Sequence, residues 1–202
     1  MPGRLFQTAP LSEIAAVLGV ESNLQEPPRA NIAPGQEVVV FDGTLRRMRW
    51  GIVPVGRVNA RGRPVMEQII NARSETVFDK SAFAGVGRAV IPVQGWYEWT
   101  GERRRKTAWG IRDRTRPFLF FAAITDVWVA PGGMEVPQVA AVTCAPSADV
   151  VDIHHRMGVL LDVEDIGTWL NGSEVEARDL MVPWPDGRLE VREAEGVDWD
   201  GP

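Results

Sequence analysis

The chain has 202 residues, of which 45% are apolar and 24% charged, as expected for one soluble domain with a sizeable hydrophobic core. It contains no run approaching the ~18 apolar residues of a membrane helix and no apolar segment before Pro10 that would suit a secretory signal. Its single cysteine, Cys144, excludes a disulfide framework and lies in an apolar run, where we expect it to be buried. We therefore expect a cytoplasmic protein that does not contact a membrane.

The net charge of −5 argues at first against a polyanionic partner, but the charge is unevenly distributed. Residues 1–158 hold nineteen basic and fifteen acidic residues, whereas residues 159–202 hold three basic and twelve acidic ones. A basic body with an acidic tail can bind DNA. A compositional preference for arginine, which supplies twenty of the 22 basic residues, would explain the same numbers. The charge distribution is therefore compatible with DNA binding but does not identify DNA as the partner. The clusters are Arg46, Arg47 and Arg49; Arg57, Arg61 and Arg63; and Arg103 to Lys106.

The first predicted element is a short helix over residues 11–20, with Ser12 as its cap and Gly19 near its end. The proline-rich residues 25–36 predict a loop. Runs of β-branched and aromatic residues bounded by Gly and Pro predict strands at residues 37–41, 43–53, 88–93, 107–111, 117–129 and 137–144.

Two later helices are predicted, one over residues 74–86 with Ser74 as its N-cap and a last one over residues 163–172, ended by Gly172. Residues 183–202 are acidic and rich in turn residues, so we expect a loosely ordered surface segment. Strands outnumber helices and do not alternate with them. The sequence therefore predicts an α+β fold, with residues 1–202 as a single domain.

Polar groups gather in the stretch IINARSET. If its first residues form a strand, Asn71 and Arg73 share one face, because side chains alternate along a strand. An amide beside a guanidinium can hold a phosphate or position an amine. A structural turn explains the same residues, so this stretch alone is a weak signal.

A second polar group stands in GWYEW, where Glu98 lies among Trp96, Tyr97 and Trp99. Aromatic surroundings desolvate a carboxylate and should raise its pKa toward the range that suits general acid–base catalysis. The alternative is a glutamate that pairs with an arginine across a hairpin.

The only two histidines, His154 and His155, are adjacent in VVDIHHRMGVLL. On an extended segment they point to opposite sides, so one can face a site while the other faces solvent. A structural histidine remains the alternative. Neighbouring histidines without cysteine partners do not supply tetrahedral zinc ligation, and we expect no metal and no cofactor.

Taken in order, these stretches resemble the signatures of the SRAP family (SOS response-associated peptidases, also described as abasic-site processing proteins). MPGRLF is similar to the family's start, Met-Cys-Gly-Arg-Phe, and RRMRWGIVP to its strand ending in W-G-x-x-P. Asn31-Ile-Ala-Pro-Gly resembles its N-x-A-P-G loop. IINARSET, GWYEW and DIHHRM resemble three further signatures, and the resemblance runs from Met1 to about Leu170.

The resemblance implies a β-barrel-like, mostly antiparallel sheet with a few peripheral helices and the N-terminal amine in a DNA-binding cleft. It implies monomeric binding of abasic sites in single-stranded or junction DNA, with a Schiff base closing into a thiazolidine on the family's cysteine. Carried onto this sequence, the catalytic residues are Pro2, Asn71, Glu98 and His154. The DNA-binding residues are Arg4, Asn31, Arg73 and Arg156, and His155 faces solvent.

Position 2 departs from the family, because Pro2 replaces the nucleophilic cysteine. Val55-Gly56 stand where the family carries an aromatic residue, and Gly158 replaces the proline of R-M-P, predicting a looser turn. Without a thiol no thiazolidine forms, but removal of Met1 would leave a secondary amine that condenses with an aldehyde to a cationic iminium. The prediction is an abasic-site lyase or transient cross-linker. The alternatives are a DNA-binding relative without covalent chemistry and a peptidase limited to removing its own Met1.

Overall fold

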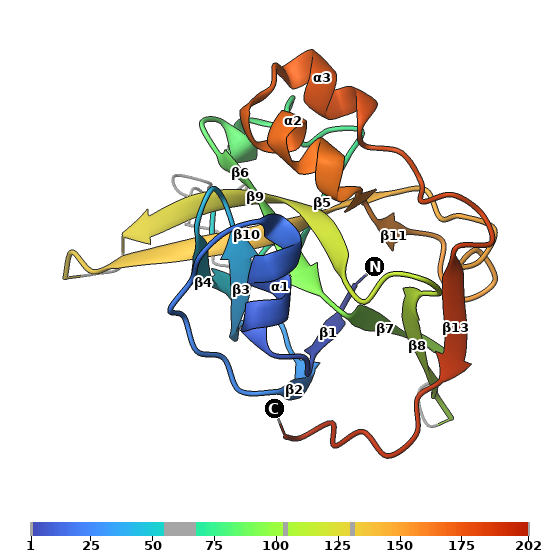
Figure 1. Cartoon of the computed structure of the whole chain (residues 1–202). Coiled ribbons are helices and arrows are strands. Elements are labelled where there is room, and N and C mark those ends of the chain that lie inside the picture. Colours follow the sequence, from blue (N-terminus) through green and yellow to red (C-terminus); the bar gives the residue numbers. More distant parts are fainter. Residues whose placement is uncertain (1, 55–67, 103–104, 130–131, 202) are drawn as a thin grey trace.

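The computed structural model describes residues 2–54, 68–102, 105–129 and 132–201 (Figure 1). The elements in chain order are β1 (Arg4–Gln7), α1 (Leu11–Leu18), β2 (Arg29–Ile32), β3 (Glu37–Phe41), β4 (Leu45–Trp50), β5 (Asn71–Arg73), η1 (Ser81–Phe83), β6 (Gly87–Val93), β7 (Gly95–Thr100), β8 (Thr107–Asp113), β9 (Leu119–Val129), β10 (Glu135–Cys144), β11 (Met157–Gly158), β12 (Leu160–Leu161), η2 (Val163–Asp165), α2 (Ile166–Asn171), α3 (Glu174–Asp179) and β13 (Leu189–Glu193).

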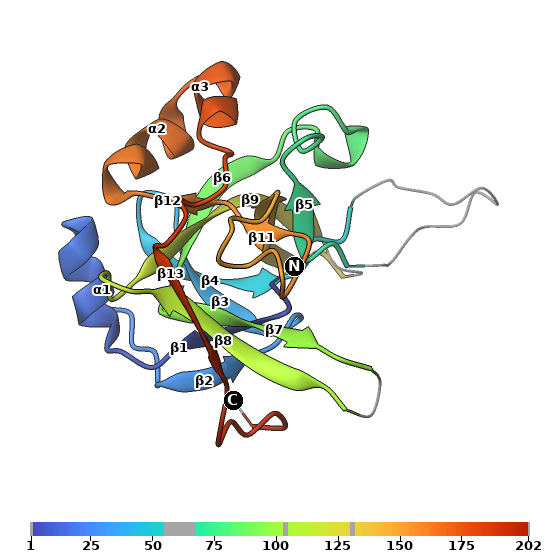
Figure 2. The ribbon, with the colours of Figure 1, turned by 90° about the vertical axis from the view of Figure 1, so that its right-hand side faces the viewer.

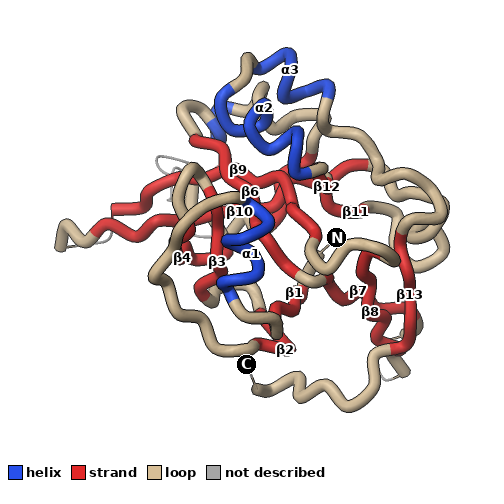
Figure 3. The backbone as a smooth tube through the Cα atoms, in the orientation of Figure 1, coloured by secondary structure: helices blue, strands red, loops and turns tan. Residues whose placement is uncertain are grey.

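Five strands form a closed barrel in the order β10-β4-β3-β6-β9, because β9 pairs with β10 as well as with β6. The pairs are antiparallel except that of β4 with β10. The short strand β5 also runs parallel to β10, beyond the residues that pair with β4. Strands make up the body of the molecule, with α1 at its side and α2 and α3 together at one end (Figure 3).

A second, antiparallel sheet has the order β13-β8-β7-β1-β2. Trp96 of β7 packs edge-on against Phe121 of β9, with 5.4 Å between ring centroids, and joins this sheet to the barrel core. Gly95 allows the close approach of β1, β7 and β8, because a Cβ there would lie 2.2 Å from the carbonyl oxygen of Ile111 and 2.3 Å from the Phe6 ring. One hydrophobic cluster therefore spans both sheets.

The expected α+β fold, with a barrel-like and mostly antiparallel sheet, is confirmed. The six predicted strands are present as β3, β4, β6, β8, β9 and β10. Helix α1 ends at Gly19, whose φ of 66° is left-handed, as predicted. Ser12 is not its cap, because the helix begins at Leu11 and no side chain caps it at Pro10. No helix in the described ranges is long and apolar enough to cross a membrane.

Two predictions of local structure are wrong, and a third, the helix over residues 163–172 ended by Gly172, is confirmed except that it is not the last helix. The predicted loop 25–36 contains β2, which is held by pairing with β1. Residues 74–86 form turns and the 3₁₀ helix η1 rather than an α-helix, and the backbone N–H of Ser74 donates to the carbonyl of Thr143 at 2.8 Å. The predicted last helix is present as η2 and α2, but α3 follows it and begins with a capping box of Ser173 and Glu176.

Within residues 183–202, the part from Trp184 to Glu193 does not form the loosely ordered surface that the composition predicts. Trp184 and Leu189 are buried, and β13 pairs with five residues of β8. Apolar residues at alternate positions of a strand cover a sheet even where the flanking residues are acidic.

Candidate active site

The amino-terminal end of the chain lies between β5, β7 and β11 in both views (Figures 1 and 2). Pro2 is buried, and its carbonyl oxygen accepts a hydrogen bond of 2.9 Å from the side-chain amide of Asn71. Arg4 lies opposite Tyr97 in the antiparallel β1–β7 pair, so the start of β1 lies beside Glu98. The structure thus brings Pro2, Asn71 and Glu98 together.

Strand β5 places Asn71 through contacts with two longer strands. The indole N–H of Trp50, at the end of β4, donates to the carbonyl of Ile70 at 3.0 Å. β10 pairs with all three residues of β5. Ala72 is buried, so Asn71 and Arg73 share the opposite face, as the alternation predicts.

The face of β5 that carries Asn71 and Arg73 opens onto a cavity of about 800 Å³. Lys80 and Ser81 also line this cavity. Asp79 lines it as well, but its carboxylate pairs with Arg178, and two cations beside two neutral polar groups can accept a phosphate.

Glu98 has the environment of a general acid or base. It is only 3% exposed, and burial raises the pKa of its carboxyl to about 7, although the charge of the chain's amino terminus lowers that pKa in part. A carboxyl with this pKa is divided between its protonated and ionised forms near neutral pH, so it can both give and take a proton.

His154 is half-buried in the loop between β10 and β11, and burial, the charge of the amino terminus and His155 lower its pKa. Its Nδ1 lies 3.0 Å from both the N–H and the carbonyl oxygen of Arg156, so either neutral tautomer finds a partner there. A neutral imidazole can accept a proton. His155 is exposed, as predicted, but the expectation that the two histidines point to opposite sides is wrong: the segment is a turn and a bend, and the two rings stack with 4.4 Å between centroids.

Arg156 is held by protein groups. Its guanidinium forms an ion pair with Glu75 and donates to Thr143, and only 13% of the side chain is exposed. The hydrogen bond from Arg156 holds the pKa of Glu75 at about 2. This pairing ties the His154 loop to the turn after β5. Its use as a phosphate contact stays a prediction.

Arg4 and Asn31 also meet, since the Nε of Arg4 donates to the side-chain oxygen of Asn31 at 3.0 Å. Asn31 is 2% exposed, and its amide group donates to the carbonyls of Asp198 and Gly201. The sequence gives no signal for these contacts, because Asp198 and Gly201 are more than 160 residues from Asn31 in the chain.

The arginine clusters are only partly described. Arg46 pairs with Asp42, and Arg47 pairs with Glu26 at 2.7 Å. Several residues named above lie outside the described residues: Val55, Gly56, Arg57, Arg61, Arg63, Arg103 and Arg104.

Two further residues bear on the departures from the family pattern. The looser turn predicted at Gly158 is wrong: this residue is in β11 opposite Thr143, and a Cβ would lie 2.0 Å from the Phe121 ring. Cys144 is buried as predicted, and burial raises the pKa of its thiol to about 12, so it cannot replace a missing N-terminal thiol. Across the described ranges, no three His, Cys, Asp or Glu side chains cluster as a metal site would require.

The chain matches the family described as SOS response associated peptidase (SRAP) over residues 1–196, and it belongs to that family. The match extends past Leu170, where the resemblance in the sequence motifs ends. It includes β13.

Among curated relatives, the abasic site processing protein YoqW of Bacillus subtilis is 26% identical over 98% of this chain and 93% of its own length. The chicken protein named abasic site processing protein HMCES is 30% identical over 72% of this chain and 51% of that protein. A crystal structure of a Bacteroides thetaiotaomicron protein has a TM-score of 0.83 at 21% identity and covers 96% of this chain and 92% of that one. This structural likeness shows a shared fold.

Proposed function

We propose that this protein processes abasic sites in DNA through the amine of Pro2, as a monomer in the cytoplasm acting on single-stranded or junction DNA. The observation that carries the proposal is the amide of Asn71 on the carbonyl of Pro2, at 2.9 Å, at the end of the chain beside Glu98. The names of the curated relatives support the substrate class.

The first step requires that Met1 be removed, because the nitrogen of Pro2 is otherwise an amide without a nucleophilic lone pair. An α-amine has a pKa of about 7.7–8.0, so a minority is free base at neutral pH. This amine attacks the aldehyde carbon C1′ of the ring-opened abasic sugar and forms a carbinolamine. Protonated Glu98 then donates to the carbinolamine hydroxyl, which leaves as water, and the product is an iminium.

The second step is β-elimination. The positive iminium acidifies the hydrogen on C2′, and neutral His154 takes that proton while the electron pair forms an enamine. The enamine expels the 3′ phosphate, which cleaves the strand and leaves an unsaturated iminium. Water hydrolyses that iminium, releases the unsaturated aldehyde and restores the Pro2 amine.

Two arginines and an asparagine would hold the DNA during these steps. Arg73 faces the cavity beside Asn71 and would bind the phosphate next to the lesion. Arg4 and Asn31 lie near the start of β1 and would hold backbone phosphate. Phosphate contacts of this kind release counterions, so binding should weaken steeply as salt rises.

Borohydride trapping tests the covalent step. Protein shown by intact mass to lack Met1 is incubated with an abasic oligonucleotide, with and without borohydride. We expect no heat-stable adduct without borohydride and a trapped one with it, since reduction converts the iminium to an amine. Pro2→Cys should give a heat-stable adduct without borohydride, because thiol and amine can close a ring. Pro2→Ala replaces the secondary amine with a primary one and should still be trapped, but weakly.

The alternative is a relative that binds abasic DNA without covalent chemistry, and it predicts no trapping by protein that demonstrably binds the DNA. Measuring affinity by anisotropy in the same samples separates the two readings. Equal and salt-insensitive affinity for abasic, intact single-stranded and duplex DNA would contradict both.

A further inference from the structure

After β13 the chain continues as residues 194–201, here called the C-terminal segment, across the outer side of the second sheet. The backbone N–H of Ala194 donates to the carbonyl of Ala108 at 2.8 Å. Further along, the side-chain amide of Asn31 donates to the carbonyls of Asp198, at 3.1 Å, and Gly201, at 2.9 Å. Both donors of the Asn31 side chain are therefore taken by this segment.

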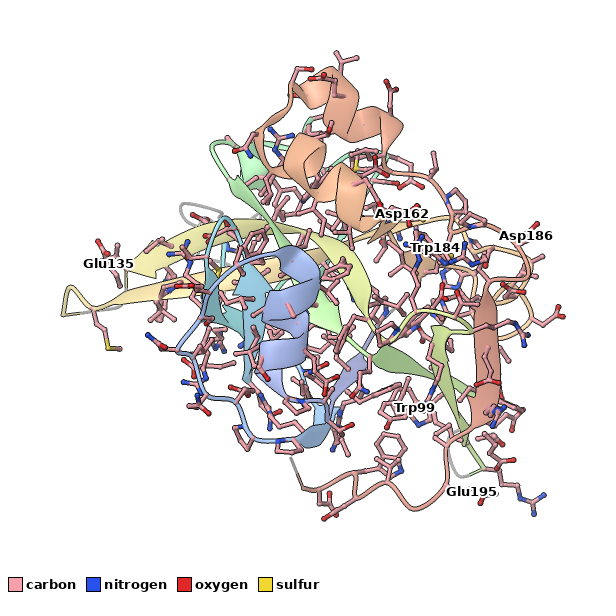
Figure 4. The ribbon with its side chains drawn as sticks, viewed as in Figure 1. Trp99, Glu135, Asp162, Trp184, Asp186 and Glu195 are labelled. Carbon is pink, nitrogen blue, oxygen red and sulfur yellow. The ribbon has the colours of Figure 1, made fainter. Side chains whose placement is uncertain are left out.

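Trp199 anchors the segment on two aromatic rings of β7. Its ring centroid lies 5.0 Å from that of Tyr97 and 5.3 Å from that of Trp99, in edge-to-face arrangements. Trp99 lies directly above the C-terminal segment, and Glu195 marks where the segment leaves β13 (Figure 4). The segment thus covers the two rings of β7 that face away from the barrel.

The C-terminal segment is acidic and held by few contacts. Glu195, Asp198 and Asp200 are exposed, and within the described residues no ion pair involves them. The segment depends on the hydrogen bonds to Asn31, the Trp199 ring contacts and its continuation from β13. The first two can break while β13 stays paired with β8.

We infer that the C-terminal segment is an autoinhibitory strap, which covers the Arg4–Asn31 surface in the DNA-free protein and is displaced when DNA binds. The inference rests on the proposed function, in which Arg4 and Asn31 hold DNA. Asn31 cannot donate to phosphate while it holds the segment, and the carboxylates of the segment repel a phosphate backbone. The covered rings of Tyr97 and Trp99 are of the kind on which unpaired bases stack.

The geometry also determines what the strap controls. Side chains alternate along β7, so Glu98 faces the same way as Trp96, toward the barrel, whereas Tyr97 and Trp99 face the strap. Displacing the strap changes how tightly DNA binds, while proton transfer by Glu98 continues at the same rate once DNA is bound.

Two variants weaken the strap in different ways. Trp199→Ala removes the anchor, and the double variant Asp198→Asn/Asp200→Asn removes two charges but keeps the backbone contacts. The matched control, Glu13→Gln/Glu135→Gln, removes two exposed charges on α1 and β10, and Glu135 lies at the opposite side of the molecule from Glu195 (Figure 4). Trp199→Phe keeps an aromatic ring, so its affinity for DNA should stay closer to that of wild type than the affinity of Trp199→Ala.

The readout is anisotropy with an intact single-stranded oligonucleotide, together with the trapping rate at saturating abasic DNA. If the strap is closed in about nine molecules of ten, its removal tightens apparent binding about tenfold. We expect Trp199→Ala to approach that gain, the Asn double variant to show a smaller one that shrinks with salt, and the control to stay near wild type. The trapping rate at saturation should not change.

Limited proteolysis supplies an independent readout: displacement of the segment by DNA should speed cleavage after Glu195 by a glutamate-specific protease. Unchanged affinity in both strap variants, or increased protection of the segment on DNA, would overturn the inference while trapping by wild type still upheld the covalent function. Tighter binding by the strap variants without any trapping would uphold the strap and overturn the covalent function. No binding of any DNA by any variant would overturn both.

Discussion

The two ends of the chain meet the same strand, β7, from opposite sides. At the amino end, Pro2 is fixed by Asn71 beside Glu98, a buried carboxyl with a pKa of about 7. At the carboxyl end, the partners of the chain are backbone hydrogen bonds and the rings of Tyr97 and Trp99. One face of β7 therefore presents a titratable carboxyl, and the other presents two aromatic rings covered by the C-terminal segment.

This difference separates two kinds of effect. Changes on the barrel side of β7 should alter the rate of the covalent step and leave affinity for DNA nearly intact. Changes on the outer side should alter affinity and leave the rate at saturation intact.

The largest expected effect is that of Glu98→Gln, which removes the titratable carboxyl and keeps the size and shape of the side chain. Loss of positioned proton transfer typically slows a reaction by ~10²–10⁴-fold. We expect trapping to slow by that factor while the affinity for abasic DNA stays close to wild type. Glu13→Gln, on the surface of α1, is the control. Trapping at the parent rate would show that Glu98 has no role in the chemistry.

His154→Ala should slow strand cleavage by about 10²-fold, at the lower end of the range for a lost general base. The adjacent and exposed His155 provides a matched control, since His155→Ala should cleave at the wild-type rate. Gel assays of cleavage at saturating DNA measure both. If the two variants lose activity equally, the assignment of His154 as the general base is wrong.

The raised pKa of Glu98 also predicts a pH dependence of stability. The pKa rises from the model-compound value of 4.5 to about 7 on folding, so the folded protein binds the proton more tightly. Its contribution to the free energy of unfolding is complete below pH 4.5 and is lost as pH rises through 7. The loss is at most about 3 kcal/mol, at about 1.36 kcal/mol per pKa unit. Denaturant melts of wild type and Glu98→Gln should therefore diverge in this window, with the wild type losing more stability. If the free energies of unfolding of wild type and Glu98→Gln change in parallel between pH 4 and pH 8, the pKa of Glu98 is not raised.

The smallest effect concerns the support of the His154 loop. Gly158→Ala should destabilise the protein by about 1–3 kcal/mol, because its methyl group would overlap the Phe121 ring. Gly167→Ala in α2 meets nothing within 4 Å and should be neutral or stabilising by up to about 1 kcal/mol. Thermal unfolding separates the two. A fully stable Gly158→Ala protein would mean that β11 does not pack against β9 as described.

The sequence predicted the residues around Pro2 better than the contacts of Arg156 and of the C-terminal segment. Alternation and aromatic context pointed to Glu98, Asn71 and Arg73 because each depends on neighbours within a few residues. The hydrogen bonds of Arg156 to Glu75 and of Asn31 to Asp198 and Gly201 join segments far apart in the chain, so local patterns do not predict them. Ser74 shows the same limit: its residue type favours a helix cap, but its N–H is taken by Thr143 of β10. The acidic composition of the last residues likewise concealed the apolar positions that hold β13 in the sheet.

The identity of the attacking amine tests the central claim most directly. The chain has two lysines, Lys80 and Lys106, and Lys80 lines the same cavity as Asn71, so it is the natural competitor of Pro2. Borohydride-trapped adduct can be digested and its modified residue located by tandem mass spectrometry. We predict the adduct on the peptide that begins with Pro2, unchanged in yield in Lys80→Arg. An adduct on Lys80 or Lys106, or its loss in Lys80→Arg, would contradict the assignment of Pro2 as the nucleophile.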